Sequence, residues 1–286
     1  MSDLRNQQPK KAERKSFFRS NPVMNRLSKV NETAVDERAA GYGRIIVKTA
    51  FFLLVTVVGI ALYLVLNNTL FSEQAAQLSM NYRGFEVSTS YLQVGFFVGA
   101  SLLAIICQIL AAFVKVTIPV TGTIYSLCQG YIISYIVFTV IKGYEHLGLL
   151  ALAITILIVM IMGILYATRV IKPTKKFMTV ILTLFIGMIS ISILTFIGSL
   201  IPLTRPFVMM IMGNFWVSLL LTAVSIIIAS LFLISDFAMI ETVVENKMPA
   251  KYEWMAAFGL AFTVLWIYVK VLDLLIQIVG NSKSSS

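Results

Sequence analysis

Two apolar runs near the C-terminal end decide the fold. Residues 215–240 read FWVSLLLTAVSIIIASLFLISDFAMI, and residues 255–279 read MAAFGLAFTVLWIYVKVLDLLIQIV. Each run exceeds the roughly 20 residues that a helix needs to cross the hydrocarbon core of a bilayer. They are also the only long apolar runs that contain charged residues. We therefore predict an integral membrane protein whose functional residues lie in this last pair of helices.

Five further apolar runs precede this pair. With 58% hydrophobic and 13% charged residues among 286, the chain leaves no room for a soluble domain of useful size. The predicted fold class is an all-α integral membrane protein, a single bundle of seven transmembrane helices. The predicted spans are residues 49–66, 91–114, 118–141, 147–167, 177–201, 215–240 and 255–279. The connections at 115–117 and 142–146 are so short that we expect the second, third and fourth helices to be antiparallel neighbours.

The positive charges predict the orientation. Of the Lys and Arg residues outside the spans, 18 lie on the side of the N-terminal tail and 4 on the opposite side. By the positive-inside rule we expect a cytoplasmic N-terminus in a bacterial plasma (inner) membrane. Residues 1–48 would form a basic cytoplasmic tail, 49–280 the transmembrane domain and 281–286 a short polar C-terminal tail. The net charge of +10 then indicates contact with lipid headgroups of the bilayer and not with nucleic acid.

Three charged residues lie inside predicted spans: Asp236, Lys270 and Asp273. A charge at the bilayer centre costs about 2.5–3.5 kcal/mol on insertion scales, so such residues are functional candidates by default. Both runs carry a stripe of small and polar residues at helical spacing. One stripe is Asn214, Ser218, Thr222, Ser225, Ala229, Phe232 and Asp236, and the other is Gly259, Thr263, Trp266, Lys270, Asp273 and Gln277. We expect the two stripes to face each other or a shared cavity.

Several short motifs resemble one family. They are ISDFAMIE at 234–241, AKYEWMAAFGL at 250–260, LWIY at 265–268 and NPVMNRL at 21–27. This set resembles the Bax inhibitor-1/YccA-like membrane proteins, in the bacterial branch with an extended loop before the last helix. The resemblance implies a seven-helix protein that leaks calcium or another cation in a pH-dependent way. It also implies a proton-sensing pair of carboxylates on the last two helices and an arginine latch on the second.

The match to that carboxylate pair is partial. Asp236 begins the Asp-x-x-x-Ile pattern that Ile240 completes, but Lys270 stands at the second acidic position, two residues after Tyr268. The predicted second helix, 91–114, contains no charge. Lys270 could therefore pair with Asp236 as partner and latch, or with Asp273 one turn along its own helix. Asp273 could supply a displaced second carboxylate, and Glu241 and Glu245 could contribute at the cytoplasmic end.

Other classes of function remain open. One is a structural or regulatory membrane protein that conducts nothing and acts through protein partners. A second is a retinal protein with Lys270 as the Schiff-base lysine. A third is an intramembrane aspartyl protease that uses Asp236 and Asp273, although neither a Tyr-Asp nor a Gly-x-Gly-Asp pattern is present. We expect a protein that is not an enzyme.

Metal and cofactor signals are weak. Cys107 and Cys128 lie in apolar runs, and the single histidine, His146, lies in a short loop. The methionines at 209, 210 and 212 are more typical of apolar packing than of soft-metal binding. We predict no cofactor and no metal. A short amphipathic segment is also expected at residues 21–30, on the inner membrane surface.

Overall fold

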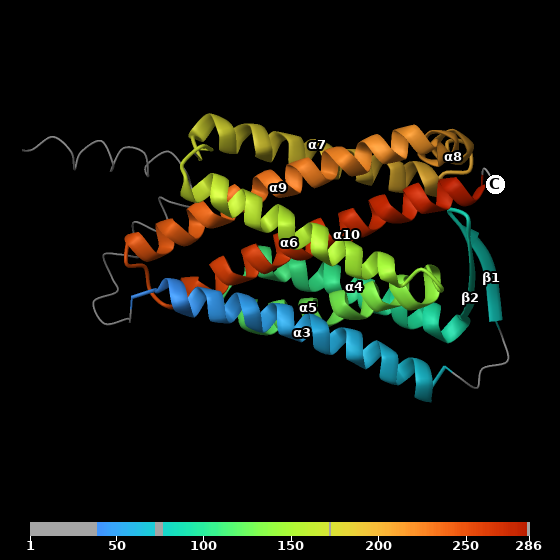
Figure 1. Ribbon diagram of the computed structural model, residues 1–286, viewed down its shortest axis with the longest axis horizontal. Helices are drawn as coiled ribbons and strands as arrows, with labels where there is room; N and C mark the ends of the chain where they lie inside the picture. The colour runs from blue at the N-terminus through green and yellow to red at the C-terminus, as the bar shows by residue number, and fades with distance from the viewer. Residues whose placement is uncertain (1–38, 72–76, 172, 285–286) are drawn as a thin grey trace, which may run out of the picture.

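The computed structural model describes residues 39–71, 77–171 and 173–284. Within this part of the chain, seven helices are long and apolar enough to cross a membrane, so the predicted fold class is confirmed (Figure 1). They are α3 (Tyr42–Thr69), α4 (Tyr91–Phe113), α5 (Ile118–Tyr135), α6 (His146–Ala167), α7 (Lys175–Leu200), α9 (Phe215–Glu245) and α10 (Lys251–Ser284). A 3-10 turn, Lys115–Thr117, precedes α5, and a π-helical turn, Ile136–Val140, continues it.

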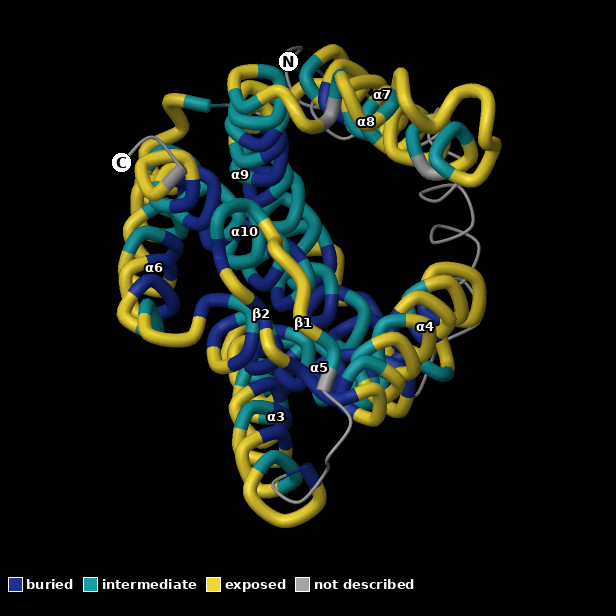
Figure 2. Tube along the Cα trace, turned by 90° about the vertical axis from the view of Figure 1, so that its right-hand side faces the viewer, coloured by how far each residue is buried: buried dark blue, intermediate teal, exposed yellow. Residues whose placement is uncertain are grey.

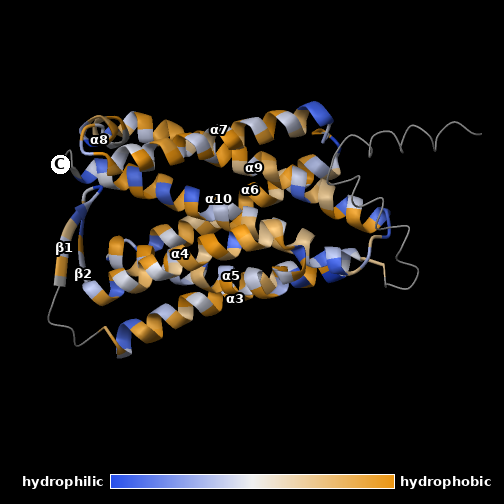
Figure 3. Cartoon of the chain, turned by 180° about the vertical axis from the view of Figure 1, so that it is seen from behind, coloured by the Kyte–Doolittle hydropathy of each residue, from blue (hydrophilic) through white to orange (hydrophobic). Residues whose placement is uncertain are grey.

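Two helices form the centre of the bundle. α10 packs against α9, α3, α6 and α5, while α5 packs against α3 and α4. Glycines bring α3 and α5 together: a Cβ atom on Gly130 would lie 2.0 Å from the backbone oxygen of Thr56. Viewed along the bundle, α7 lies at the periphery (Figure 2), where its main contacts are with α8 and α9. Hydrophobic residues predominate along the helices between the two ends (Figure 3), and many of them are exposed.

The expected pairing of the third and fourth helices is wrong. α5 does pack against α4, but α6 packs mainly against α10 and α9. The chain turns at Gly143, whose φ is +86°, and only the start of α6 approaches the preceding element. There, a Cβ atom on Gly148 would lie 3.2 Å from Val137 of the π-helical turn. Beyond this contact α6 packs along α10. The short connection that precedes α6 therefore does not make α6 pack along the whole of α5.

A β-hairpin lies between the first two predicted spans, in a segment for which the sequence analysis predicted no regular structure. β1 (Gln77–Tyr82) pairs antiparallel with β2 (Phe85–Ser90). The connecting residues Arg83 and Gly84 both have positive φ, 52° and 81°, which suits the twist of a two-residue hairpin turn. β2 leads directly into α4, whose first turn is closed by a capping box between Ser90 and Gln93. The hairpin therefore has a fixed connection to the bundle.

Helix boundaries also extend past the predicted spans. α3 begins at Tyr42, inside the segment assigned to the N-terminal tail, and α10 continues to Ser284, through most of the segment assigned to the C-terminal tail. A short helix, α8 (Arg205–Gly213), was not predicted and contains the three methionines. The amphipathic segment expected at 21–30 lies outside the described residues.

Candidate functional site in the last helical pair

The two polar stripes of α9 and α10 meet, as predicted. Near the end that carries the hairpin, the Thr222 hydroxyl donates to Asp273 Oδ2 at 3.2 Å. The Gln277 amide donates to Thr222 Oγ1 at 2.8 Å and to Asp273 Oδ2 at 3.1 Å. Towards the other end, a Cβ atom on Gly259 would lie 3.4 Å from Asp236 Oδ1. The interface between these helices therefore contains two acids at different depths.

Asp236 is the acid without a charged partner. Its Oδ2 atom is buried and has no hydrogen-bond partner among the described residues. The Thr263 side chain of α10 is close enough to hydrogen-bond the carboxyl group, and the missing side chain of Gly259 leaves room for it. A buried carboxylate is costly unless it is paired, so this group is suited to hold a proton or a cation.

Lys270 pairs with neither acid. The ion pairs with Asp236 and Asp273, both considered from sequence, are absent, and Lys270 has no hydrogen-bond or ion-pair partner within the described part of the chain. Its side chain instead lines a cavity of about 420 Å³ between α4, α5, α7 and α10. Lys270 therefore lies on α10 beside the interface with α9, but its side chain lines a separate cavity.

Asp273 is held from outside the helical pair. Arg83, in the turn of the hairpin, lies with Nη1 3.8 Å from Asp273 Oδ1, and its Nη2 donates to Ser218 of α9 at 3.1 Å. The hairpin turn rests directly on α10, because a Cβ atom on Gly280 would lie 1.9 Å from the Arg83 carbonyl oxygen. The sequence had offered no arginine on the second helix, and this arginine comes just before it.

Glu241, predicted at the cytoplasmic end, also has partners. It accepts a hydrogen bond from Tyr166 and one of 2.6 Å from Arg169 Nη2, both at the end of α6. The carboxylate of Glu241 raises the pKa of Arg169 above its ordinary value. Glu245 is the last residue of α9, one turn further along. Glu241 therefore ties α6 to α9, and it lies apart from Asp273.

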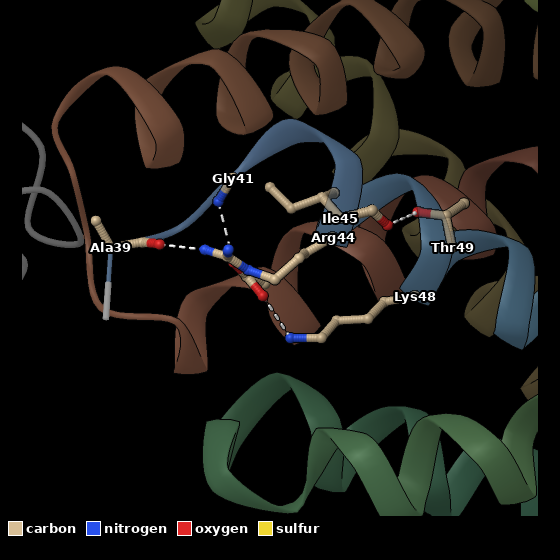
Figure 4. Close-up of polar contacts among 7 residues, drawn as sticks. Ala39, Gly41, Arg44, Ile45, Lys48 and Thr49 are labelled. Atoms are coloured by element: carbon tan, nitrogen blue, oxygen red, sulfur yellow. Dashed lines mark hydrogen bonds and ion pairs between the residues drawn. The ribbon is translucent and has the colours of Figure 1, made fainter. Parts of the chain in front are cut away.

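One buried acid was missed by the sequence analysis. Glu253, at the start of α10, is 1% exposed and accepts from Arg44 Nε at 2.7 Å and Lys48 Nζ at 2.6 Å. The backbone nitrogen of Gly41 adds a third donor at 3.0 Å. Figure 4 shows Arg44 and Lys48 extending from the same face of α3. Their spacing of one helical turn was the sequence signal that could have found this cluster.

The aspartyl protease and the retinal protein each need two functional groups at one site, and the geometry fits both alternatives poorly. An aspartyl protease needs two carboxylates at one site, but Asp273 is bound by Arg83, Thr222 and Gln277, with Asp236 elsewhere in the interface. Among the described residues, no carboxylate lines the Lys270 cavity, so none is placed to serve as counterion to a retinal Schiff base. Within the described residues, no group of three or more His, Cys, Asp or Glu side chains could hold a metal.

Seven long apolar helices, with charged side chains buried between them, define a multi-pass membrane protein. A family model described as Bax inhibitor 1 like matches residues 21–280. The chain therefore belongs to the Bax inhibitor 1 like family, and the resemblance noted from its motifs is confirmed. A search of curated proteins and a search of solved structures each returned no match.

Proposed function

We propose that this protein is a pH-influenced leak for calcium or another cation, and not an enzyme. The observation that carries the proposal is Asp236: a carboxyl group between two apolar helices, with a buried oxygen that lacks a partner. An unpaired carboxylate at this depth is stable when it binds a proton or a cation. Exchange between the two would make cation passage depend on pH.

Asp273 and Arg83 support a gate at the hairpin end of the same interface. A cation that reaches Asp273 must compete with the guanidinium group, which is already 3.8 Å away. Both side chains are about a third exposed, at 31% and 27%, so the contact is screened by water and can exchange. Arg83 would thus perform the task that the family resemblance assigns to an arginine of the second helix.

The proposal can be tested by cation flux into proteoliposomes. The parent protein should carry calcium at a rate that changes between about pH 6 and pH 8, because a buried carboxyl group can be shifted into this range. Asp236→Asn should abolish that pH dependence. Ser230→Ala, which removes a hydroxyl of α9 that donates to the Ile226 carbonyl oxygen and keeps the carboxyl group, serves as the control and should retain it. A pH profile identical in the parent and Asp236→Asn would overturn the role of Asp236.

We also propose a cytoplasmic N-terminus in a bacterial plasma membrane, on the basis of the 18-to-4 distribution of basic residues. Ser79 is exposed on β1 and Thr174 is exposed before α7, at opposite ends of the bundle. In intact cells, an impermeant thiol reagent should label Ser79→Cys and spare Thr174→Cys. Labelling of Thr174→Cys but not of Ser79→Cys would show that the orientation is the reverse of the one proposed.

A regulatory protein that conducts nothing is the second candidate. It is favoured by the ion pairs that occupy Asp273, Glu241 and Glu253, which leave those acids unavailable to a cation. The same liposome assay separates the two proposals. Absence of flux for calcium, potassium and protons at every pH would favour the regulatory role.

A further inference from the structure

The cavity around Lys270 is lined by α4, α5, α7 and α10, and α7 lies at the periphery of the bundle (Figure 2). Its volume of about 420 Å³ falls within the range of about 300–1,000 Å³ that holds small organic ligands. α4 and α7 each contribute one wall, yet neither is a main packing partner of the other. The cavity therefore lies beside a seam through which a molecule dissolved in the bilayer can enter.

The lining combines one charge with apolar surface. Its aromatic residues are Tyr125, Phe185, Phe262 and Trp266, and its amides are Gln108 and Gln129. The rings of Phe185 and Trp266 lie 5.5 Å apart and join the walls formed by α7 and α10. Lys270 is the one charged residue among the described residues of the lining. A ligand that fits this space is mostly apolar and carries a single acidic group.

Lys270 has no partner among the described residues, and this favours an acidic group on the ligand. Desolvation of an ammonium group costs several kcal/mol unless an anion compensates it, and no described residue supplies one. A carboxylate meets the need, because it can form an ion pair with the ammonium group.

The depth of Lys270 in the bilayer limits which acids can reach it. Lys270 precedes Gly280 by ten residues, about 15 Å along a helix at 1.5 Å per residue, near the middle of a hydrocarbon core of about 30 Å. The charged headgroups of phospholipids stay at the surface of the bilayer. A fatty acid can cross the core in its neutral form and deliver the carboxyl group to that depth.

We propose that this cavity binds one long-chain fatty acid, with its carboxylate at Lys270 and the amides and its chain against the aromatic residues. The ion pair is non-covalent, and the proton of the acid goes to water. This site goes beyond the cation leak and does not depend on it, because its lining comes from α4, α5, α7 and α10 and does not include Asp236.

Binding of radiolabelled oleate to the full-length protein in phosphatidylcholine nanodiscs tests the site. We expect one oleate per protein, and an affinity about ten- to a hundredfold lower in Lys270→Met, because a charge-assisted hydrogen bond is lost. Lys115→Met is the matched control: it makes the same chemical change at an exposed position away from the cavity, and its affinity should equal that of the parent. Oleyl alcohol, which has the same chain without the acid, should bind the parent as weakly as oleate binds Lys270→Met.

A second variant protects the test against a loss of folding. Ser192→Phe places a ring in the cavity from α7 while Lys270 is kept, and it should also weaken oleate binding. Equal oleate affinity in the parent and Lys270→Met would overturn the proposal. Equal binding of oleyl alcohol and oleate would overturn it too. Displacement of oleate by millimolar chloride would identify a site for small inorganic anions instead.

Discussion

α3 and α7 are equally apolar, yet they occupy very different places in the bundle. In the most apolar stretch of each helix, 28% of the residues of α3 are buried but only 6% of those of α7. α3 packs against α5 and α10, whereas α7 mainly contacts α8 and α9. Apolar character predicts that a segment crosses the bilayer, because lipid and protein interior are both apolar. It does not predict which helices form the centre.

Two kinds of local contact distinguish α3 from α7. α3 carries Arg44 and Lys48, which bind the buried Glu253, and its residues Thr56 and Gly59 meet Gly130 of α5 backbone to backbone. In α7, a Cβ atom on Gly187 would contact nothing within 4 Å. α3 is therefore held to the central helices α10 and α5 by ion pairs and by close glycine contacts. Each of these contacts can be broken singly.

The largest expected effect is the loss of the Glu253 contacts. Glu253→Gln leaves two cations without their anion, and breaking a buried ion pair costs about 3–5 kcal/mol. Because Arg44 is 38% exposed and Lys48 18%, both cations can turn towards water, so we expect about 2–3 kcal/mol. The melting temperature in detergent should fall by several degrees. Glu241→Gln, whose partner Arg169 is 58% exposed, should cost clearly less. An equal fall in both variants would contradict the central role of the Glu253 cluster.

A smaller effect is expected from one methyl group at the contact between α3 and α5. Gly130→Ala would place Cβ 2.0 Å from the Thr56 oxygen, and relief of such overpacking typically costs about 1–3 kcal/mol. Gly187→Ala in α7 makes the same change in open space and should leave the melting temperature unchanged or slightly higher. If the two variants melt alike, α7 is packed as tightly as α3 and the contrast between the helices fails.

The same contrast explains how far the sequence could predict the structure. The seven spans and the contact between the α9 and α10 stripes followed from local patterns. The partners of the buried charges did not: Arg83 and Asp273, or Lys48 and Glu253, lie far apart in sequence, and no periodic pattern within one helix pairs them. The packing of α6 against α10 was missed for the same reason. The hairpin was missed because its turn is Arg83–Gly84, a less specific signal than Asn-Gly or Asp-Gly.

A still smaller loss of stability is expected for the contact between the hairpin and α10. Arg83→Ala removes an ion pair of 3.8 Å that is about a third exposed, and such pairs contribute about 0.2–1 kcal/mol. The close backbone contact with Gly280 should keep the hairpin in place. Calcium flux should nevertheless rise, because Asp273 loses its competing cation. Arg205→Ala, at the start of α8, removes a charge on the same side and should change neither property. Flux that stays at the parent level in Arg83→Ala would exclude a latch at this position.

No spectral effect at all is expected when the purified protein is incubated with all-trans-retinal. The cavity between the central helices and α7 offers aromatic walls and Lys270, which resembles the surroundings of a Schiff-base lysine. A protonated Schiff base also needs a buried anion close by, because its positive charge would otherwise be desolvated without compensation. In the part of the chain that the structure describes, no Asp or Glu lines this cavity. A protonated Schiff base should therefore not accumulate, and no visible absorption band should appear. Lys270→Ala is the control, and a band that is present in the parent and absent in this variant would replace the fatty-acid site with a chromophore site. A flat visible spectrum, together with oleate binding that requires Lys270, would show that the lysine recognises an acid and not an aldehyde.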